Sequence, residues 1–313
     1  MIEIIAHALV PIFFVIGLGY VAGLSRSIDN HHVGELNALV MQFALPASLF
    51  VATATTPWSK MQGEESIVLL LGVAMMVPYA IWYLVARRKG VSHSEASLRA
   101  LTVALPNFAA AGLPIAQAVI GPAATIHGAI AIALGSILPS PVTLLILEMA
   151  QPADGKISTA HRVLRSMRRS LLKPIVAAPI VGTLISFAGF ELDPLMASSL
   201  QLIGASAGSI ALFLTGLVLS SQPFRLNRSV VEGTLVATVA RPALVWGMTI
   251  LFAVPAEEAR IAILLAAMPS GFFGILFGIN YKAASQTVGS IVIATTVTSA
   301  VTIGVVIALL FPA

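Results

Sequence analysis

The side chains best suited to chemistry in this chain lie at two interruptions of otherwise apolar segments. The interruptions fall within residues 100–119 and 260–279. They contain Pro106, Asn107, Gly112 and Pro114 in the first segment, and Pro269, Ser270 and Gly271 in the second. A proline inside a helix removes a backbone hydrogen bond, and a nearby glycine lets the chain leave the helical conformation. A helix that restarts after such a break presents unpaired N–H groups, which favour bound anions. The alternative is that these residues only kink the helices for packing.

A single cation lies deep within an apolar segment, and it is Arg241, near the middle of 230–253. A charge in that position is costly and is usually retained for function. We expect Arg241 either to neutralise an anionic ligand or to orient the broken helices, while pairing with backbone carbonyls is the purely structural alternative. Gln42, which precedes Pro46 in another apolar segment, is a further candidate for lining a cavity.

The groups that are missing from the sequence also restrict the chemistry. No Asp or Glu lies in the middle of an apolar segment, whereas exchange of cations for protons usually needs a buried carboxylate. One arginine and two helix breaks therefore favour an organic anion. The chain contains no cysteine, no HExxH motif and no glycine-rich lysine loop for nucleotide phosphates. We accordingly predict no catalytic residue, no metal site and no cofactor, and we do not expect an enzyme.

The elements that position these residues are predicted to be membrane-spanning helices. Hydrophobic residues form 58% of the 313 residues and charged residues only 10%, against about 25% in a typical soluble domain. A spanning helix needs about 20 mostly apolar residues. Ten segments satisfy this length: 5–24, 36–55, 66–85, 100–119, 125–147, 171–189, 197–219, 230–253, 260–279 and 288–311.

The basic residues test this count independently. With ten helices, fourteen of the seventeen Lys and Arg residues fall in connections on one side, and Lys60 and Arg260 alone fall on the other. Such an imbalance is typical of a correct topology with the basic side in the cytoplasm. The protein is therefore expected in the cytoplasmic membrane as a multi-pass protein with both termini outside. The same clustering between apolar segments argues against binding of nucleic acid.

A basic connection at 151–170 divides the chain into two sets of five helices, residues 1–150 and 171–313. An odd number of helices in each set gives the two sets opposite orientations, and inverted repeats of this kind are common in secondary transporters. Each interrupted segment is the fourth of its set. Matched interruptions are the best indication of a transporter's central site in a sequence.

The chain resembles the auxin efflux carrier family, and more closely its bacterial branch of malonate transporters. The resemblance is carried by HALVPIFFVIGLGYVAG at the start, LNALVMQFALPASLF in the second segment, N-x-x-x-x-G-L-P in the fourth and AAMPSGFFG in the ninth. It covers essentially the whole chain. It implies two inverted five-helix repeats whose proline-broken helices cross at a central site, between a scaffold and a transport domain that moves like an elevator.

The resemblance also implies roles for individual residues. Asn107 would contact the carboxylate of the substrate. The plant members have a second asparagine in the ninth segment, where this chain has Ser270, Gly271 and two phenylalanines. That departure argues against auxin and suits a small dicarboxylate better.

We therefore predict an all-α secondary carrier of small organic anions, with malonate or another dicarboxylate as the candidate substrate, driven by membrane potential or by proton symport. In this reading Asn107 and Ser270 hydrogen-bond the substrate and Arg241 supplies positive potential, while the glycines and prolines shape the crossing. A sodium-coupled symporter of bile-acid type and a non-transporting receptor or scaffold are the alternatives. The expected partners are the anion and the lipid bilayer, and monomer or homodimer is left open.

Overall fold

The computed structural model describes residues 2–28, 32–61, 63–150, 164, 168 and 172–311. Within these ranges the chain forms helices joined by short connections, and the one strand-like pairing is an isolated bridge between Pro106 and Ser270. The prediction of an all-helical protein is confirmed. The basic connection predicted at 151–170 lies almost wholly outside the described residues.

The helices of the first half follow the predicted segments and bend or break close to prolines. They are α1 (Ile2–Leu24), α2 (Val33–Ala38), the π-helical turn η2 (Leu39–Ala44), α3 (Leu45–Ala54), α4 (Trp58–Met61), α5 (Glu65–Arg88), α6 (His93–Ala104), the π-helical turn η3 (Phe108–Gly112), α7 (Leu113–Ile120), α8 (Ala124–Ile137) and α9 (Pro139–Met149). α6 begins before the predicted residue 100 because Ser92 caps it, with its hydroxyl accepting a hydrogen bond from the Glu95 amide at 3.3 Å.

The helices of the second half have the same character. They are α11 (Pro174–Phe187), α12 (Pro194–Gly204), α13 (Ala207–Ser220), α14 (Arg228–Leu235), the π-helical turn η4 (Val236–Ala240), α15 (Arg241–Leu251), α16 (Ala256–Ala266), α17 (Phe273–Asn280) and α18 (Gln286–Leu310). The predicted segment 260–279 is thus divided between α16 and α17.

Within the described ranges, six helical stretches are long and apolar enough to cross a membrane, judged by length and composition. They are Val33–Ala54, Glu65–Arg88, Ala124–Met149, Pro194–Ser220, Arg228–Leu251 and Gln286–Leu310. Three shorter apolar stretches are Leu9–Leu24, Phe108–Ile120 and Pro174–Phe187. Every predicted segment is therefore helical, while ten crossings in two inverted repeats remain a prediction.

Three of the helices share one local construction, a π-helical turn with a proline shortly after it. η2, η3 and η4 each end two residues before the prolines Pro46, Pro114 and Pro242. Proline lacks the N–H that an α-helix needs and its ring clashes with the carbonyl four residues earlier. The widened turn relieves that clash without ending the helix, and such bulges are frequent at functional sites.

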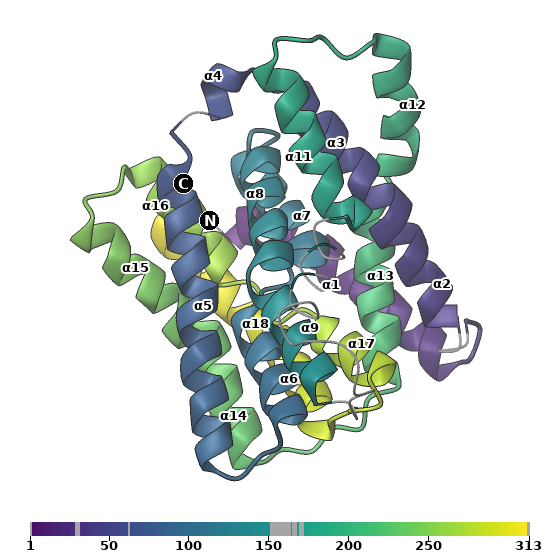
Figure 1. Ribbon diagram of the computed structural model, residues 1–313, viewed down its shortest axis with the longest axis vertical. Coiled ribbons are helices and arrows are strands. Elements are labelled where there is room, and N and C mark those ends of the chain that lie inside the picture. The colour runs from purple at the N-terminus through teal and green to yellow at the C-terminus, as the bar shows by residue number, and fades with distance from the viewer. Residues whose placement is uncertain are drawn as a thin grey trace.

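The helix contacts divide the helices into two groups, which we call the first and second bundles. In Figure 1 most of the first bundle lies at the right and most of the second at the left, and α1 of the first bundle crosses behind the centre. In the first bundle α1 packs on α13, and α3 packs on α11 and α12. In the second bundle α5 packs on α6 and α8, α15 on α16, and α14 on α18. Both broken helices, α6–α7 and α16–α17, belong to the second bundle. η3 and α8 also contact the first bundle, so the first break lies close to the seam between the two.

Several of the connections between helices lie at the two ends of the molecule's long axis. The α5–α6, α13–α14 and α17–α18 connections lie at the lower end of Figure 1 with Lys89, Arg225 and Lys282, and α5 ends there with Arg87 and Arg88. We call this end the basic end. The α11–α12 connection, which carries Glu191 and Asp193, lies at the upper end. The basic side chains of these connections thus gather at one end, and the acidic ones of the α11–α12 connection lie at the other.

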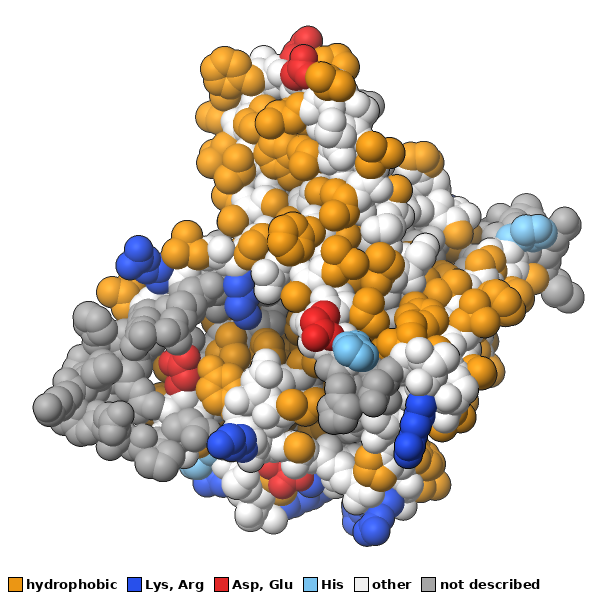
Figure 2. Space-filling view, turned by 90° about the vertical axis from the view of Figure 1, so that its right-hand side faces the viewer, with side chains coloured by type: hydrophobic (Ala, Val, Ile, Leu, Met, Phe, Trp, Pro, Cys, Tyr) orange, Lys and Arg blue, Asp and Glu red, His pale blue; other side chains and the backbone are white. Residues whose placement is uncertain are grey.

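The surface between the two ends is strongly apolar. Large side chains such as Leu202 and Leu309 are 83% and 74% exposed. In the face shown in Figure 2, hydrophobic side chains cover most of the upper part, and the Lys and Arg side chains lie in the lower half. Water would solvate such a surface poorly, whereas lipid chains would cover it.

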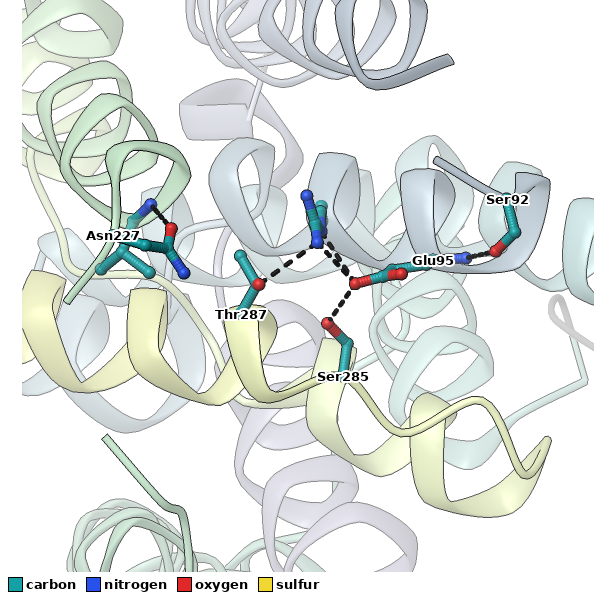
Figure 3. Close-up of polar contacts among 7 residues, drawn as sticks. Ser92, Glu95, Asn227, Ser285 and Thr287 are labelled. Carbon is teal, nitrogen blue, oxygen red and sulfur yellow. Dashed lines mark hydrogen bonds and ion pairs between the residues drawn. The ribbon is translucent and has the colours of Figure 1, made fainter. Parts of the chain in front are cut away.

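The second bundle is also joined by polar contacts near the basic end (Figure 3). The Glu95 carboxylate on α6 accepts hydrogen bonds from Arg99 at 2.6 Å and from the Ser285 hydroxyl at 2.9 Å. Arg99 also donates to the Thr287 hydroxyl at 3.2 Å. This network ties the start of α6 to the start of α18, so the broken helix and α18 are expected to move as one unit.

Candidate functional site

The two predicted helix breaks are joined to each other by backbone hydrogen bonds. The Asn107 amide donates to the Pro269 carbonyl at 2.7 Å, and the Gly271 amide donates to the Leu105 carbonyl at 3.0 Å. Pro106 and Ser270 therefore lie opposite each other in an antiparallel bridge. The sequence predicted that these two breaks form one site, and the structure brings them into direct contact.

The breaks form where the sequence predicts them for local reasons. Leu105 has φ −96° and ψ 107°, an extended conformation that proline favours in the residue before it. α6 consequently ends at Ala104. The helix restarts at Asn107, whose side-chain oxygen accepts a hydrogen bond from the Ala110 amide at 3.2 Å. Asparagine is one of the best residues for capping a helix in this way.

Arg241 holds the ends of both broken helices. Its side chain is fully buried, and its guanidinium donates to the carbonyls of Val103, Ala266 and Met268, at 2.8 Å from Nη1 to Val103 and 2.8 Å from Nε to Ala266. The last carbonyls of a helix have no partner inside it and carry the negative end of its dipole. Arg241 satisfies such carbonyls in the last turn of α6 and at the end of α16, and these contacts offset the burial of its charge.

These contacts decide between two of the roles considered for Arg241. The guanidinium is engaged with backbone carbonyls and orients the broken helices. Its charge nevertheless lies at the junction of the two breaks, so it contributes positive potential there. A guanidinium has five N–H donors, and three contacts are made within the described part of the chain.

Asn107 is nearly buried, with 6% of its surface exposed. Its side-chain oxygen is used by the cap, and its amide nitrogen donates no hydrogen bond among the described residues. An asparagine amide carries two such donors. Asn107 therefore combines a fixed orientation with donors that are available to a ligand at the break.

Ser270 is fully buried and its hydroxyl makes no hydrogen bond within the described ranges. Its backbone amide donates to the Thr295 hydroxyl on α18 at 3.2 Å, which fixes the position of the residue. A buried hydroxyl without a partner costs roughly 1–3 kcal/mol. In native proteins such a group usually has a partner in water or a ligand, and Ser270 lies one bridge position from Asn107.

The predicted glycines and prolines occupy the crossing in different ways. Pro106 and Pro269 are at the bridge itself, and Pro114 packs against α13, where its Cγ lies 3.4 Å from the position of a Cβ on Gly208. A Cβ added to Gly112 or to Gly271 would meet its neighbours only at 3.5 Å or beyond. Steric space therefore does not require glycine at either position.

The structure places Gln42 apart from this arrangement. Gln42 lies in η2 of the first bundle and its side chain is exposed. It makes no hydrogen bond with residues of either break among the described residues. Gln42 lies inside its π-helical turn, whereas Asn107 caps the start of η3, so the two residues do not occupy equivalent positions.

A small cavity opens beside the first break, at the seam between the two bundles. Its volume is about 50 Å³, enough for a few waters or a carboxylate group. It is lined by Leu105, Pro106, Phe108, Ala109, Ile132, Gly135, Ser136, Ser140, Lys173, Ile175, Phe273 and Phe277. The walls are mostly apolar, and Lys173 is the one charged residue among them.

Lys173 belongs to this site although it was not among the residues predicted to bind a ligand. The sequence predicted only that it is one of the basic residues that indicate topology. The available signal was its place immediately before Pro174, near the start of the apolar segment 171–189, where the lysine has no neighbouring carboxylate in the sequence. Among the described residues, no group of three His, Cys, Asp or Glu side chains is arranged to hold a metal ion.

A family model and several relatives match most of this chain. The model described as "Membrane transport protein" matches residues 4–307. The protein named "Uncharacterized transporter YfdV" of Escherichia coli K12 is 22% identical over 281 residues, which cover 89% of each chain. The protein named "Putative malonate transporter" of Rhizobium meliloti is 23% identical over 304 residues, which cover 96% of this chain and 93% of the relative. A protein of Methanothermobacter thermautotrophicus named as an uncharacterized transporter is 22% identical, covering 95% of each chain.

Proposed function

The chain belongs to the membrane transport protein family, that of the auxin efflux carriers it resembles, and on this premise we propose that it is a secondary transporter of small organic anions. Malonate or another dicarboxylate is the leading substrate, because one relative that spans nearly the whole chain bears the name of a malonate transporter. The resemblance to the same bacterial branch supports the same substrate class.

The observation that carries this proposal is the junction of the two helix breaks. Two helices restart there, at Asn107 and Phe272, and the amides at a helix start favour negative charge. Asn107 and Ser270 add uncommitted donors, and Arg241 adds a formal positive charge in an apolar interior. Such an arrangement stabilises a carboxylate and offers little to a cation.

Arg241 acts in this proposal as a positioning residue. Its three carbonyl contacts fix the distance between the ends of α6 and α16 and so set the geometry of the crossing. Its charge reaches the substrate as a field, which is weakly screened in a medium of low dielectric constant. Direct hydrogen bonding to the substrate is assigned to Asn107 and Ser270.

The two-bundle architecture supports an elevator-like mechanism. Both breaks lie in the second bundle, and the seam with the first bundle passes beside them. Sliding of the second bundle against the first would carry a bound anion from one membrane face to the other without dismantling its site. Rigid movement of one bundle against the other is common among transporters with paired broken helices.

The topology completes the proposal. We place the basic end in the cytoplasm, in accordance with the positive-inside rule, with ten helices in two inverted repeats and both termini outside. The membrane is the cytoplasmic membrane. Residues 1–150 and 171–313 would then form the two repeats around the basic connection, and a homodimer is compatible with this arrangement.

Two other functions make different predictions. A sodium-coupled symporter of bile-acid type also has crossed broken helices, but its uptake would require sodium. A receptor or scaffold would bind a ligand without moving it. Transport by potential or by proton symport would continue when sodium is replaced by choline, which separates the first alternative from the proposal.

The decisive experiment is uptake of radiolabelled malonate into liposomes that contain the purified protein. Uptake is measured with no gradient, with a proton gradient, with a sodium gradient and with an imposed membrane potential. Saturable uptake that Asn107→Ala abolishes supports the proposal. If malonate and a panel of other mono- and dicarboxylates all fail to enter under every gradient, the organic-anion function is wrong.

A further inference from the structure

The cavity beside the first break is built from both bundles. Lys173 and Ile175 come from the start of α11 in the first bundle. Pro106 and Phe108 come from the break, and Phe277 from α17, all in the second bundle. A molecule in this cavity would therefore contact the two parts of the protein that the proposed mechanism moves against each other.

Lys173 is held in place by the local backbone and by an aromatic ring. Its residue is extended, with φ −62° and ψ 133°, and its carbonyl accepts hydrogen bonds from the Val176 and Ala177 amides at 2.9 Å. Its Nζ lies 5.5 Å from the centre of the Phe277 ring, within the range of a cation–π contact. The ammonium group is thus directed to the side of the cavity that α17 forms.

The ammonium of Lys173 makes no ion pair within the described part of the chain. Other exposed cations near the basic end do make such pairs, as Lys89 and Arg228 do with Glu232. Lys173 is an exposed residue, so its ammonium can meet an anion that arrives from solvent at the cavity, and the charge attracts that anion. The lining also contains two serines. The Ser140 hydroxyl donates to the Gly135 carbonyl, whereas the Ser136 hydroxyl makes no hydrogen bond among the described residues.

We propose that Lys173 is the residue that recognises the charge of the carboxylate at the cytoplasmic face, and that it does so in only one state of the transport cycle. This inference rests on the proposed function and extends it. Lys173 belongs to the first bundle, whereas Asn107 and Ser270 belong to the second. Asn107 and Ser270 do not line this cavity, so a carboxylate held there by Lys173 lies beside the break that carries Asn107. It loses Lys173 when the second bundle slides away. The lysine therefore raises affinity on the cytoplasmic side without stabilising the anion on the outer side.

Vesicles of two orientations separate the two faces. Inside-out membrane vesicles from expressing cells present the cytoplasmic face to the medium, and right-side-out vesicles present the outer face. We expect Lys173→Gln to raise the KM for the transported carboxylate about tenfold in inside-out vesicles, as loss of one charge-assisted contact would. The KM in right-side-out vesicles should change less than twofold by the same argument. Lys173→Arg keeps the charge and should retain most of the affinity.

Arg88→Gln is the matched control, because it removes one exposed cation from the same end without touching the cavity. If Lys173→Gln leaves KM unchanged in both orientations, or raises it no more than Arg88→Gln does, the inference is wrong while the proposed function stands. An equal rise in both orientations contradicts the one-state role. If the unsubstituted protein moves no carboxylate, it is the proposed function that fails.

The thermal stability of each purified variant identifies a variant that is simply misfolded, and Lys173→Arg then provides the test.

Discussion

The amide of Asn107 donates a hydrogen bond to the carbonyl of Pro269 at 2.7 Å, so the two helix breaks are joined through their backbones. With the reciprocal bond from Gly271 to Leu105, this contact fixes the breaks relative to each other. A ligand bound at one break therefore has a fixed position relative to the other break. The predictions below test this junction and the helix contacts that support it.

Asn107 has two functions that substitution can separate. Asn107→Asp keeps a good helix cap but places a negative charge where we propose a carboxylate binds. We expect malonate uptake to fall to background while the melting temperature in detergent changes little. Asn107→Ala loses the cap as well, which costs about 1 kcal/mol of stability. Uptake by Asn107→Asp at the original rate would contradict the placement of the anion at this break.

Arg241 is expected to be needed for stability more than for contact with the substrate. Arg241→Met leaves the carbonyls of Val103, Ala266 and Met268 without a partner in the interior, at roughly 1–3 kcal/mol for each unsatisfied group. We expect the variant to melt several degrees lower and to be recovered in lower yield. Arg241→Lys should be intermediate. An unchanged melting temperature with loss of transport would instead assign Arg241 to the substrate.

Gly274 and Gly112 both lie near the breaks but differ in the space around them, so Gly112 serves as the control for Gly274. A Cβ on Gly274 would lie 2.1 Å from the Thr102 hydroxyl and 3.2 Å from the Leu98 carbonyl, whereas a Cβ on Gly112 has 3.5 Å to its nearest neighbours. We expect Gly274→Ala to separate α17 from α6 and to lower the melting temperature, at about 1–3 kcal/mol for overpacking. Gly112→Ala should be tolerated. Equal stability of the two variants, measured by thermal unfolding in detergent, would contradict this packing.

Gly19 and Gly216 allow α1 and α13 to meet closely in the first bundle. A Cβ on Gly19 would lie 2.0 Å from the Phe213 carbonyl oxygen, and one on Gly216 would lie 1.9 Å from the Ile16 carbonyl oxygen. Small residues that admit such close contact stabilise helix pairs in membranes. Either change to alanine should lower the yield of folded protein and its melting temperature. Gly17→Ala is the control, because no neighbour lies within 4 Å of that position.

Much of the helical framework followed from the sequence, because helices and their interruptions depend on local composition. Each of the ten apolar segments is helical, and the breaks occur at the prolines that predicted them. The divisions that were missed, such as those between α8 and α9 and between α12 and α13, are short bends in segments that are still apolar throughout. A bend inside a segment does not change its local hydropathy when the residues on both sides of the bend are apolar.

The candidate site followed from the sequence only in part. Asn107 and Ser270 were found because they stand beside the prolines that create the breaks. Gln42 stands in a similar sequence context, yet its side chain faces outward, since which face of a helix is covered depends on its neighbours. Lys173 was missed for the same reason, because its importance depends on Phe277 and the break, which are distant in the chain.

The sequence by itself determined that this is an apolar, helical membrane protein with two matched interruptions and one deep cation. Those features depend on the solvation of single residues and on the backbone chemistry of proline and glycine, both of which are local. Only the tertiary structure decided what Arg241 binds, that the two breaks pair, and that Lys173 lies at the seam of the bundles. A side chain's partners come from helices that are far apart in the chain, so packing alone brings them together.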